Sequence, residues 1–413
     1  MIFNLLYIDP GTGSALFSIL IGAAATLFFL GRALWIKIKV FISGGRIHIT
    51  ESSKNPYVIY NEGKQYSNLF LPILDEFETR KIKIKYFTSD PEDPLFKNKY
   101  NSVDLEYIGE GNRAYSRLNL LNADVVLMTT PGLGVYQLKR SKGVRHYSHI
   151  LHAPSDATMY RLFGIDYFDS VLLTGDYQAA DIRILEQQRG INKKQLVTVG
   201  CTYLDVYSDK LKHIPVKEKE QFTVLVSPSW GSSAILSRYG EKLLNPLLDT
   251  GFHITIRPHP QSKKSESSLL EKFTLKYQNS KNLEWDYERE NLYSMAKSDI
   301  MISDFSGIIF DYSFLFDKPV IYINSGFDIR PYDADDLGEN ATDSLWQFKT
   351  LREIGIELKE EDFPKIGSLI RNVSDNEQLR IARKNAKSSA WQYQGQAAKK
   401  VVDFLVSTLE ITV

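Results

Sequence analysis

Residues 300–311 read IMISDFSGIIFD, in which an apolar run is followed by a polar turn and a second apolar segment. The run Ile300–Ile302 is typical of a buried strand, and the residues after Gly307 can form a helix. A Ser-Gly pair at such a turn lets backbone N–H groups approach a phosphate, and the partial positive charge of a helix amino terminus favours the same ligand. The stretch therefore predicts a strand-turn-helix unit of an α/β fold, with a candidate phosphate site at its turn.

Two interpretations of this turn stay open on the local sequence. In one, Ser306 and Gly307 bind a phosphate, and Asp311 returns toward the ligand to hold a hydroxyl group. In the other, Asp304 or Ser306 only caps the helix, which requires no ligand. The local residues favour the two equally.

The same alternation of short apolar runs and longer amphipathic stretches extends along most of the chain. The expected strands are Tyr57–Tyr60, Ile82–Phe87, Val125–Met128, Val171–Leu173, Val197–Val199, Thr223–Val226, His253–Ile256, Ile300–Ile302 and Val320–Ile323. Leu69–Glu78 and Gln178–Arg189 have helical spacing. Short, nearly continuous apolar strands separated by helices predict parallel sheets that are covered on both faces.

The rhythm of strands and helices predicts two Rossmann-like domains that face a cleft. The charged stretch DKLKHIPVKEKEQ at residues 209–221 is the expected join between them. The predicted parts are an amino-terminal membrane anchor with its basic flank (1–45), a first domain (46–215), and a second domain that includes the carboxyl-terminal helices (216–413). A ligand would then lie at the carboxyl ends of the strands, near the join.

The overall composition is that of a globular protein with a substantial core. The chain has 413 residues, of which 43% are apolar, and its 50 Lys and Arg balance its 50 Asp and Glu. A general nucleic-acid binder would usually carry a basic excess, so we expect no nucleic-acid partner. Cys201 is the sole cysteine, so the chain contains neither an intramolecular disulfide nor a cysteine-based zinc site.

The amino terminus departs from this average. The stretch from Pro10 to Gly31 carries no charged residue and would reach about 33 Å as a helix, enough to cross a membrane. Basic residues follow from Arg32 to Arg46, with no acidic residue before Glu51, which predicts an outside amino terminus and cytoplasmic domains. Because this charge follows the apolar stretch, a single transmembrane helix is favoured over a cleaved signal peptide. A buried hydrophobic helix is the remaining alternative.

The stretch RPHP at residues 257–260 ends one of the predicted strands. Proline cannot continue a central strand ladder, so the strand ends there in a fixed turn. Arg257 and His259 can present hydrogen-bonding or cationic groups to a phosphate from this position. A structural loop that carries a surface histidine is the alternative.

Three histidines lie three residues apart in HYSHILHAPS, residues 146–155. In a helix they would spread over roughly 200°, and in a strand His149 would point away from His146 and His152, so we assign no metal site to them. His152 follows an apolar run and precedes a proline turn, which predicts a base in a loop at a strand end. A neutral imidazole there can take a proton from an attacking hydroxyl. A histidine held only by backbone contacts is the alternative.

Two further motifs are weaker. The acidic run DADD at residues 333–336 resembles the pair that some glycosyltransferases use to bind a metal, but no strand directly precedes it, so a solvated acidic loop is expected. Gly132-Leu133-Gly134 lacks the full dinucleotide-binding fingerprint.

In their order along the chain, these motifs resemble those of the CDP-glycerol glycerophosphotransferase family, which includes teichoic acid primases and polymerases. The resemblance covers roughly Val144 to Ile323. It includes the His152 loop, GCTYLD at 200–205, SPSW at 227–230, RPH at 257–259, SDFSG at 303–307 through Asp311, and Lys318-Pro319. Ala153 and Gly307 depart from the family, which commonly has glycine and serine at these positions.

The resemblance implies a GT-B fold, with the acceptor on the first domain and the nucleotide donor on the second. His152 would match the catalytic base and His259 a residue that contacts phosphate. Ser306 and Asp311 would match positions that hold the donor. The donor pyrophosphate would then lie near Arg257, His259 and the turn at Ser306 and Gly307.

The implied activity is transfer of glycerol phosphate, or a related alditol phosphate, from a CDP-linked donor to a hydroxyl of a lipid-linked or glycan acceptor. Such a reaction would release CMP, would serve bacterial cell-envelope polymer synthesis, and would take place at the cytoplasmic membrane. Phosphates can recruit Mg²⁺ without a recognisable protein motif, so a role for this ion stays open. Two alternatives also stay open: a GT-B glycosyltransferase or epimerase that uses a UDP-sugar, and a non-catalytic nucleotide-sugar or polymer-binding component of an envelope complex.

Overall fold

The computed structural model describes residue 31 and residues 54–214, 221–288, 290–324, 326–338 and 341–412. The chain separates into two compact units, 1–54 and 55–413, and the description below concerns the second. Apart from Gly31, the predicted membrane anchor (1–45) lies outside the described residues. Within the described ranges, no helix combines the length and the apolar character that crossing a membrane requires.

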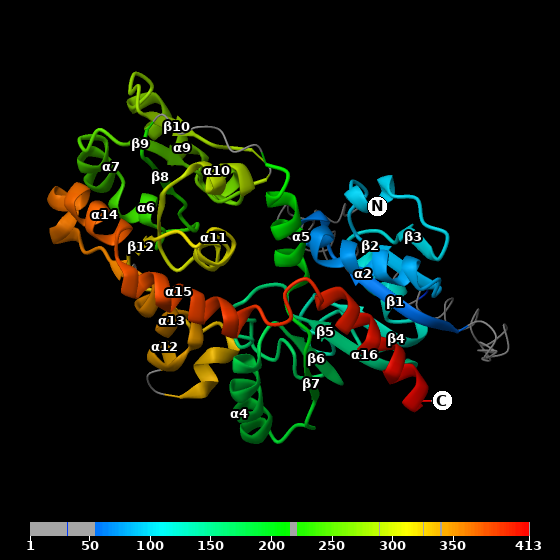
Figure 1. Cartoon of the computed structure of the whole chain (residues 1–413). Helices are drawn as coiled ribbons and strands as arrows, with labels where there is room; N and C mark the ends of the chain where they lie inside the picture. The colour runs from blue at the N-terminus through cyan, green and yellow to red at the C-terminus, as the bar shows by residue number, and fades with distance from the viewer. Residues whose placement is uncertain are drawn as a thin grey trace, which may run out of the picture. The chain divides into compact units, whose positions relative to one another are not determined.

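The first sheet contains seven parallel strands in the order β3-β2-β1-β4-β5-β6-β7 (Figure 1). Its strands are β1 (Asn55–Asn61), β2 (Ile84–Thr88), β3 (Val103–Tyr107), β4 (Asn122–Met128), β5 (Gly143–Ile150), β6 (Ser170–Leu173) and β7 (Gln195–Thr198). Alternate residues of β1 enter different clusters, with Val58 and Tyr60 in one and Tyr57 and Ile59 in the other. Both faces are therefore buried, which explains why such strands read as continuous apolar runs.

The second sheet contains six parallel strands in the order β10-β9-β8-β11-β12-β13. Its strands are β8 (Thr223–Val226), β9 (His253–Ile256), β10 (Leu283–Trp285), β11 (Ile300–Ser303), β12 (Val320–Tyr322) and β13 (Gly355–Glu357). Ile300 and Ile302 face one core cluster and Met301 the other. In both sheets the order runs outward in two directions from neighbouring central strands, which is the doubly wound Rossmann arrangement.

Helices connect and cover these strands. They are α2 (Ser67–Thr79), α3 (Asn112–Leu118), α4 (Ala179–Arg189), α5 (Thr202–Leu211), α6 (Ile235–Tyr239), α7 (Glu241–Leu248), α8 (Ser262–Ser265), α9 (Ser267–Lys276), α10 (Leu292–Lys297), α11 (Ile308–Phe316), α12 (Ala341–Ser344), α13 (Trp346–Ile354), α14 (Ile366–Ser374), α15 (Glu377–Ala390) and α16 (Ala397–Thr412). Below, the first domain is the seven-stranded sheet with the helices that cover it, and the second domain is the six-stranded sheet with its helices.

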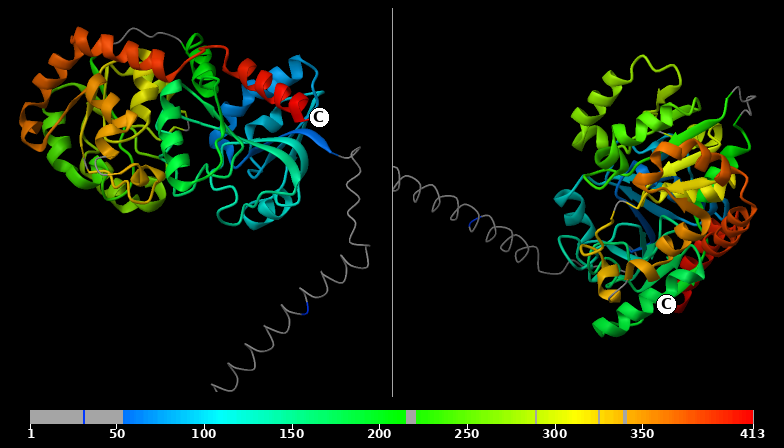
Figure 2. Two further views of the ribbon diagram at one scale, coloured as in Figure 1. Left: turned by 90° about the horizontal axis from the view of Figure 1, so that it is seen from below. Right: turned by 90° about the vertical axis from the view of Figure 1, so that its left-hand side faces the viewer.

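The carboxyl-terminal helix belongs with the first domain. Val401, Val402 and Leu405 of α16 are buried in the same cluster as residues of α2 and β4. Figures 1 and 2 show this red helix beside the blue elements α2 and β1. Asp205 at the start of α5 accepts hydrogen bonds from Trp391 Nε1 and Gly395 N, both at 2.8 Å, where the chain crosses back. Our sequence analysis had assigned this helix to the second domain.

The predicted α/β architecture with parallel sheets is confirmed, and each predicted strand is present with small shifts at its ends. Four strands were missed, namely the short edge strands β3, β10 and β13 and the histidine-bearing β5. The boundary predicted at residues 215 and 216 stays a prediction, because residues 215–220 lie outside the described part. The two sheets do lie on either side of it.

Candidate active site

The residues predicted to form the site gather at the carboxyl ends of parallel strands. His152 follows β5 in the first sheet, His259 follows β9 in the second, and Ser306 follows β11. Because the carboxyl ends of parallel strands share one edge of a sheet, His259 and Ser306 lie on the same side of the second domain. Asp311 lies one turn into α11, whose N-cap is Gly307.

His152 contacts three neighbouring segments of the first domain. Its Nδ1 is 3.0 Å from Thr129 Oγ1 and 3.3 Å from the Tyr160 hydroxyl. The Tyr66 ring packs against the imidazole with centroids 4.9 Å apart. Burial lowers the pKa of His152 to about 4, so the imidazole is neutral at pH 7. A neutral histidine is the protonation state that a general base requires.

The other two histidines of the run have separate partners. His146 Nε2 lies 2.9 Å from Ser170 Oγ, whereas His149 is fully buried with Nε2 3.1 Å from the Tyr160 hydroxyl. The described residues contain no group of three or more His, Cys, Asp or Glu side chains placed to hold a metal ion.

Arg257 is engaged in the second domain's own structure. Its Nη1 lies 2.5 Å from Asp286 Oδ2, and its Nη2 donates to the Glu288 carbonyl at 2.6 Å. Both contacts join the end of β9 to the segment after β10. The guanidinium therefore fixes the turn that carries His259, and its place in donor binding stays a prediction.

The ring nitrogens of His259 are placed to donate a hydrogen bond and not to accept a proton. Its Nδ1 accepts a hydrogen bond from Gln261 N at 3.1 Å, so this nitrogen carries the lone pair. Partial burial lowers the pKa of the imidazole, which keeps it neutral. The single ring proton must then lie on Nε2, which makes no hydrogen bond to any described residue. His259 can therefore donate to an acceptor such as a phosphate oxygen.

Asp304 organises the turn that opened the sequence analysis. Its buried carboxylate accepts from Ser229 N at 3.1 Å, from Ser229 Oγ at 2.8 Å, and from the backbone N–H groups of Ile235 and Ser306 at 3.2 Å. It therefore ties the turn after β11 to the loop after β8. A Cβ at Gly307 would meet no atom within 4 Å, so the backbone there is open to approach.

Asp311 faces the first domain. Tyr203 of α5 donates a hydrogen bond to Asp311 Oδ1. Burial raises the pKa of Asp311 to about 8, so the carboxyl is largely protonated at pH 7. A neutral carboxyl can donate or accept a hydrogen bond without repelling an anionic ligand.

A cavity of about 240 Å³ in the second domain lies beside the turn that contains Asp304 and Phe305. Phe305, Phe327 and Phe348 line it together with polar groups that include Asn324 and Arg352. Aromatic walls with a few polar groups are typical of small-molecule sites.

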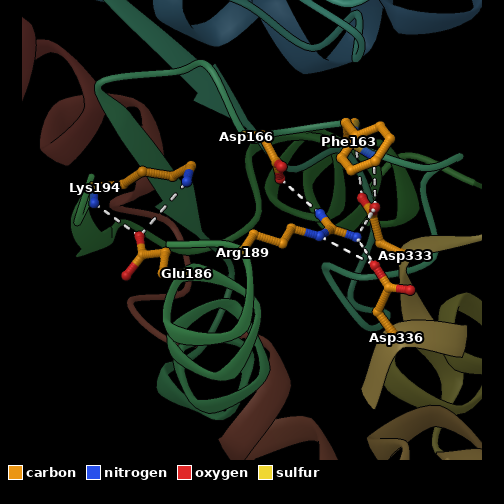
Figure 3. Close-up of polar contacts among 8 residues, drawn as sticks. Phe163, Asp166, Glu186, Arg189, Lys194, Asp333 and Asp336 are labelled. Carbon is orange, nitrogen blue, oxygen red and sulfur yellow. Dashed lines mark hydrogen bonds and ion pairs between the residues drawn. The ribbon is translucent and has the colours of Figure 1, made fainter. Parts of the chain in front are cut away.

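The acidic run at 333–336 joins the two domains through Arg189 (Figure 3). Asp333 is buried, so the predicted solvated loop is wrong for this residue, whereas Asp335 and Asp336 are exposed as predicted. Arg189 at the end of α4 lies 2.7 Å from Asp333, 2.8 Å from Asp166 and 2.6 Å from Asp336. Asp333 also accepts from the backbone N–H groups of Phe163 and Gly164. The guanidinium occupies the space between these carboxylates, so the motif does not fit a metal ion.

The loop from residue 153 to 168, between β5 and β6, is bound to the second domain at a further place. Asp156 accepts from Trp346 N and Gln347 N, each at 2.8 Å, at the start of α13. Burial raises the pKa of Asp156 to about 7. Asp333 N also donates to the Tyr160 carbonyl at 2.8 Å. The loop that supplies Tyr160 to His152 is therefore held by both domains.

Sequence reasoning missed several of these residues. Thr129 lies in the stretch TTPGLG, whose sequence resembles only an incomplete dinucleotide-binding motif. Nothing in the sequence around Tyr160 or Asp156 indicates that these residues belong to the site. Asp304 was noted as a helix cap, but its contacts with Ser229 come from a distant segment. Only the predicted convergence of strand ends could have grouped them.

Comparison with known proteins agrees with this architecture. The wall teichoic acid polymerase TagF is 15% identical in sequence, with a TM-score of 0.55 over 89% of this chain and 92% of that one. The UDP-GlcNAc 2-epimerase of Neisseria meningitidis, solved with UDP-GlcNAc bound, is 15% identical, with a TM-score of 0.55 over 85% of this chain and 100% of that one. At this identity the likeness shows the fold alone. No curated protein matches the chain.

The sequence itself matches a protein-family model. The model is that of the CDP-glycerol:poly(glycerophosphate) glycerophosphotransferases, and it matches residues 178–407, which is more than half of the chain. The matched region contains the turn at Asp304, the His259 loop and α11. The chain therefore belongs to the CDP-glycerol:poly(glycerophosphate) glycerophosphotransferase family.

Proposed function

We propose that the protein transfers glycerol phosphate, or a related alditol phosphate, from a CDP-linked donor to a hydroxyl of a lipid-linked or glycan acceptor. Family membership supports the donor and the reaction. The observation that carries the assignment of roles is a neutral His152 at a strand end, whose Nε2 makes no hydrogen bond to any described residue.

The donor is expected on the second domain, across a cleft of the GT-B type. His259 Nε2–H, the Ser306 hydroxyl and the backbone N–H of Gly307 would bind the pyrophosphate, since all three groups lie at one edge of the sheet. The backbone N–H of Ser306 is already bonded to Asp304. Asp311, protonated at neutral pH, would hold a hydroxyl of the donor without repelling its phosphates. Arg257 would contribute by fixing the turn that carries His259.

The reaction would be a displacement at the phosphorus that bears glycerol. The acceptor oxygen forms a new P–O bond, the bond to the CMP oxygen breaks, and His152 Nε2 takes the hydroxyl proton. Hydrogen-bond donors that the protein holds in place before the reaction stabilise negative charge on the oxygens of the transferred phosphate, because they need not reorganise. Any Mg²⁺ would reach the site with the donor phosphates and would add to that stabilisation.

The expected site of action is the bacterial cytoplasmic membrane. The uncharged stretch from Pro10 to Gly31 and the basic residues after it support a single-pass anchor with both domains in the cytoplasm. Such an anchor would confine the enzyme to the surface that holds a lipid-linked acceptor of teichoic acid type.

The test is a donor panel with the purified full-length protein and mixed lipid-linked acceptors. CDP-glycerol, CDP-ribitol and UDP-GlcNAc are supplied separately, and CMP, UDP and epimerised sugar are measured. CMP release that requires both a CDP-alditol and an acceptor supports the proposal. UDP release or epimerisation would overturn it in favour of a UDP-sugar enzyme. Donor binding without turnover under all conditions would overturn it in favour of a binding component.

A further inference from the structure

The hydroxyl of Thr129 lies between two hydrogen-bond partners. Its Oγ1 donates to the backbone carbonyl of Ile150 at 2.8 Å, and it lies 3.0 Å from His152 Nδ1. Thr129 follows β4 directly and Ile150 ends the neighbouring β5, so the parallel pairing of these strands brings the groups together. Thr129 is 1% exposed, so no bulk water competes for either contact.

The number of protons and lone pairs on each group determines the direction of each hydrogen bond. A carbonyl oxygen only accepts, and a hydroxyl has one proton and two lone pairs. The single proton of Thr129 is therefore committed to Ile150, and only a lone pair faces the imidazole. His152 Nδ1 must then carry the ring proton, because a lone pair there would face another lone pair at 3.0 Å.

Tyr160 supplies a second oxygen to the same nitrogen. Its hydroxyl lies 3.3 Å from His152 Nδ1 and 3.1 Å from His149 Nε2. His149 Nδ1 is buried without a hydrogen-bond partner, and a buried N–H without a partner is rarer than an unpaired acceptor. His149 therefore carries its proton on Nε2 and donates to Tyr160, whose oxygen can also accept from His152 Nδ1. The proton of the Tyr160 hydroxyl is then left for the Thr129 hydroxyl oxygen, with which Tyr160 also interacts.

We infer that Thr129 is a positioning residue that holds His152 as the Nδ1–H tautomer and so leaves the lone pair on Nε2 for the acceptor hydroxyl. The inference rests on the proposed role of His152 as the base. The hydroxyl does the work that a third group does in other base-containing sites, which is to orient the ring and fix its tautomer. Unlike a carboxylate, a hydroxyl adds no charge beside the imidazole, so the ring stays neutral.

The first experiment reads the tautomer directly and needs no turnover. Full-length protein labelled with ¹⁵N-histidine is examined by NMR at pH 7, and the His152 signals are assigned with the His152→Gln variant. Wild type is expected to show a protonated Nδ1 and an unprotonated Nε2, and Thr129→Val is expected to shift population toward Nε2–H. A wild-type His152 protonated on Nε2 overturns the inference, whether or not the proposed reaction is correct.

The second experiment compares two variants at one position. Thr129→Val removes the hydroxyl while keeping the shape, and Thr129→Ser keeps the hydroxyl. We expect Thr129→Val to lower kcat by about tenfold to hundredfold with little change in the KM for CDP-glycerol, and Thr129→Ser to retain most of the wild-type kcat. A wild-type kcat in Thr129→Val, or an equal loss in both variants, contradicts the inference. Donor binding by calorimetry and thermal unfolding confirm that each variant is folded.

Discussion

His152 and His259 lie at equivalent places in the two domains, each just beyond the carboxyl end of a parallel strand. Both are partly buried and both are neutral at pH 7, because burial lowers the pKa of each imidazole. They differ in what faces Nδ1. At His152 this is the acceptor oxygen of Thr129, and at His259 it is the backbone N–H of Gln261.

That single difference gives the two imidazoles opposite chemistry. His152 places its proton on Nδ1 and is left with a lone pair on Nε2, which suits a base. His259 has its lone pair on Nδ1 and its proton on Nε2, which suits a donor to phosphate. The same side chain on the same kind of strand end can thus serve either role, and a neighbouring hydrogen bond decides between them.

Removing the base should produce the largest effect. We expect His152→Ala to lower the kcat for CMP release by about a thousandfold, within the range of general acid–base catalysis, with donor affinity unchanged. Release of CMP in the presence of acceptor is the measurement, and calorimetry gives the affinity for CDP-glycerol. His253→Ala, on the same strand as the His259 turn but at its other end, is the matched histidine control. Retention of wild-type kcat in His152→Ala would end the comparison.

The contact between the domains should come next. Asp333→Ala leaves the backbone N–H groups of Phe163 and Gly164 without an acceptor and removes one of the buried carboxylates around Arg189, which keeps Asp166. This should lower the free energy of unfolding by about 3 kcal/mol. Asp336→Ala removes the more exposed partner of the same guanidinium and should cost less than about 1 kcal/mol. Denaturant unfolding measures both. Equal effects would show that burial does not set the strength of this contact.

Loss of His259, which is predicted to donate a hydrogen bond to a phosphate of CDP-glycerol, should have a smaller effect. His259→Ala removes one hydrogen bond to the donor and is expected to raise the KM for CDP-glycerol about tenfold, with kcat changed less. His259→Gln keeps a side-chain N–H and should recover part of the loss. If His259→Ala lowers kcat as far as His152→Ala with no change in donor binding, the two roles have been assigned the wrong way round.

The fold was largely predictable, because it depends on patterns within single segments. Ile300–Ile302 and the other central strands are apolar throughout, since both faces of each sheet are covered. The edge strands β3, β10 and β13 are short or partly exposed and lack this signal. The return of α16 to the first domain was not predictable, because its apolar face would suit either sheet.

The site was predictable only where its residues stand in one motif. His152, His259 and Ser306 each follow an apolar run and precede a turn, so their places at strand ends were foreseen. Thr129 and Asp333 act through partners that are distant in sequence, and only the folded chain reveals them. Burial also changed the meaning of the acidic run, because a sequence does not show that an arginine from α4 lies among its carboxylates.

The smallest expected effect is that of mild acid on the imidazole of His152. An unperturbed histidine gains a proton near pH 6.5, but burial lowers the pKa of His152 to about 4, so the base stays neutral as the pH falls from 7 to 5.5. We therefore expect kcat/KM for CDP-glycerol to change less than about twofold over this range, since kcat/KM reports the free enzyme. Its acidic limb should appear only as the pH approaches 4.

The carboxyl group of Asp156 does titrate in this window and needs a parallel measurement. Burial raises the pKa of Asp156 to about 7, but its carboxylate bonds the start of α13 and neither histidine. Because the folded-state pKa lies above that of a free aspartate, protonation of Asp156 below pH 7 should favour the folded state, which circular dichroism checks at each pH. A fall in kcat/KM with a midpoint near pH 6.5 in fully folded protein would mean that His152 is exposed and charged like a free histidine. The contrast with His259 would then lose its physical basis.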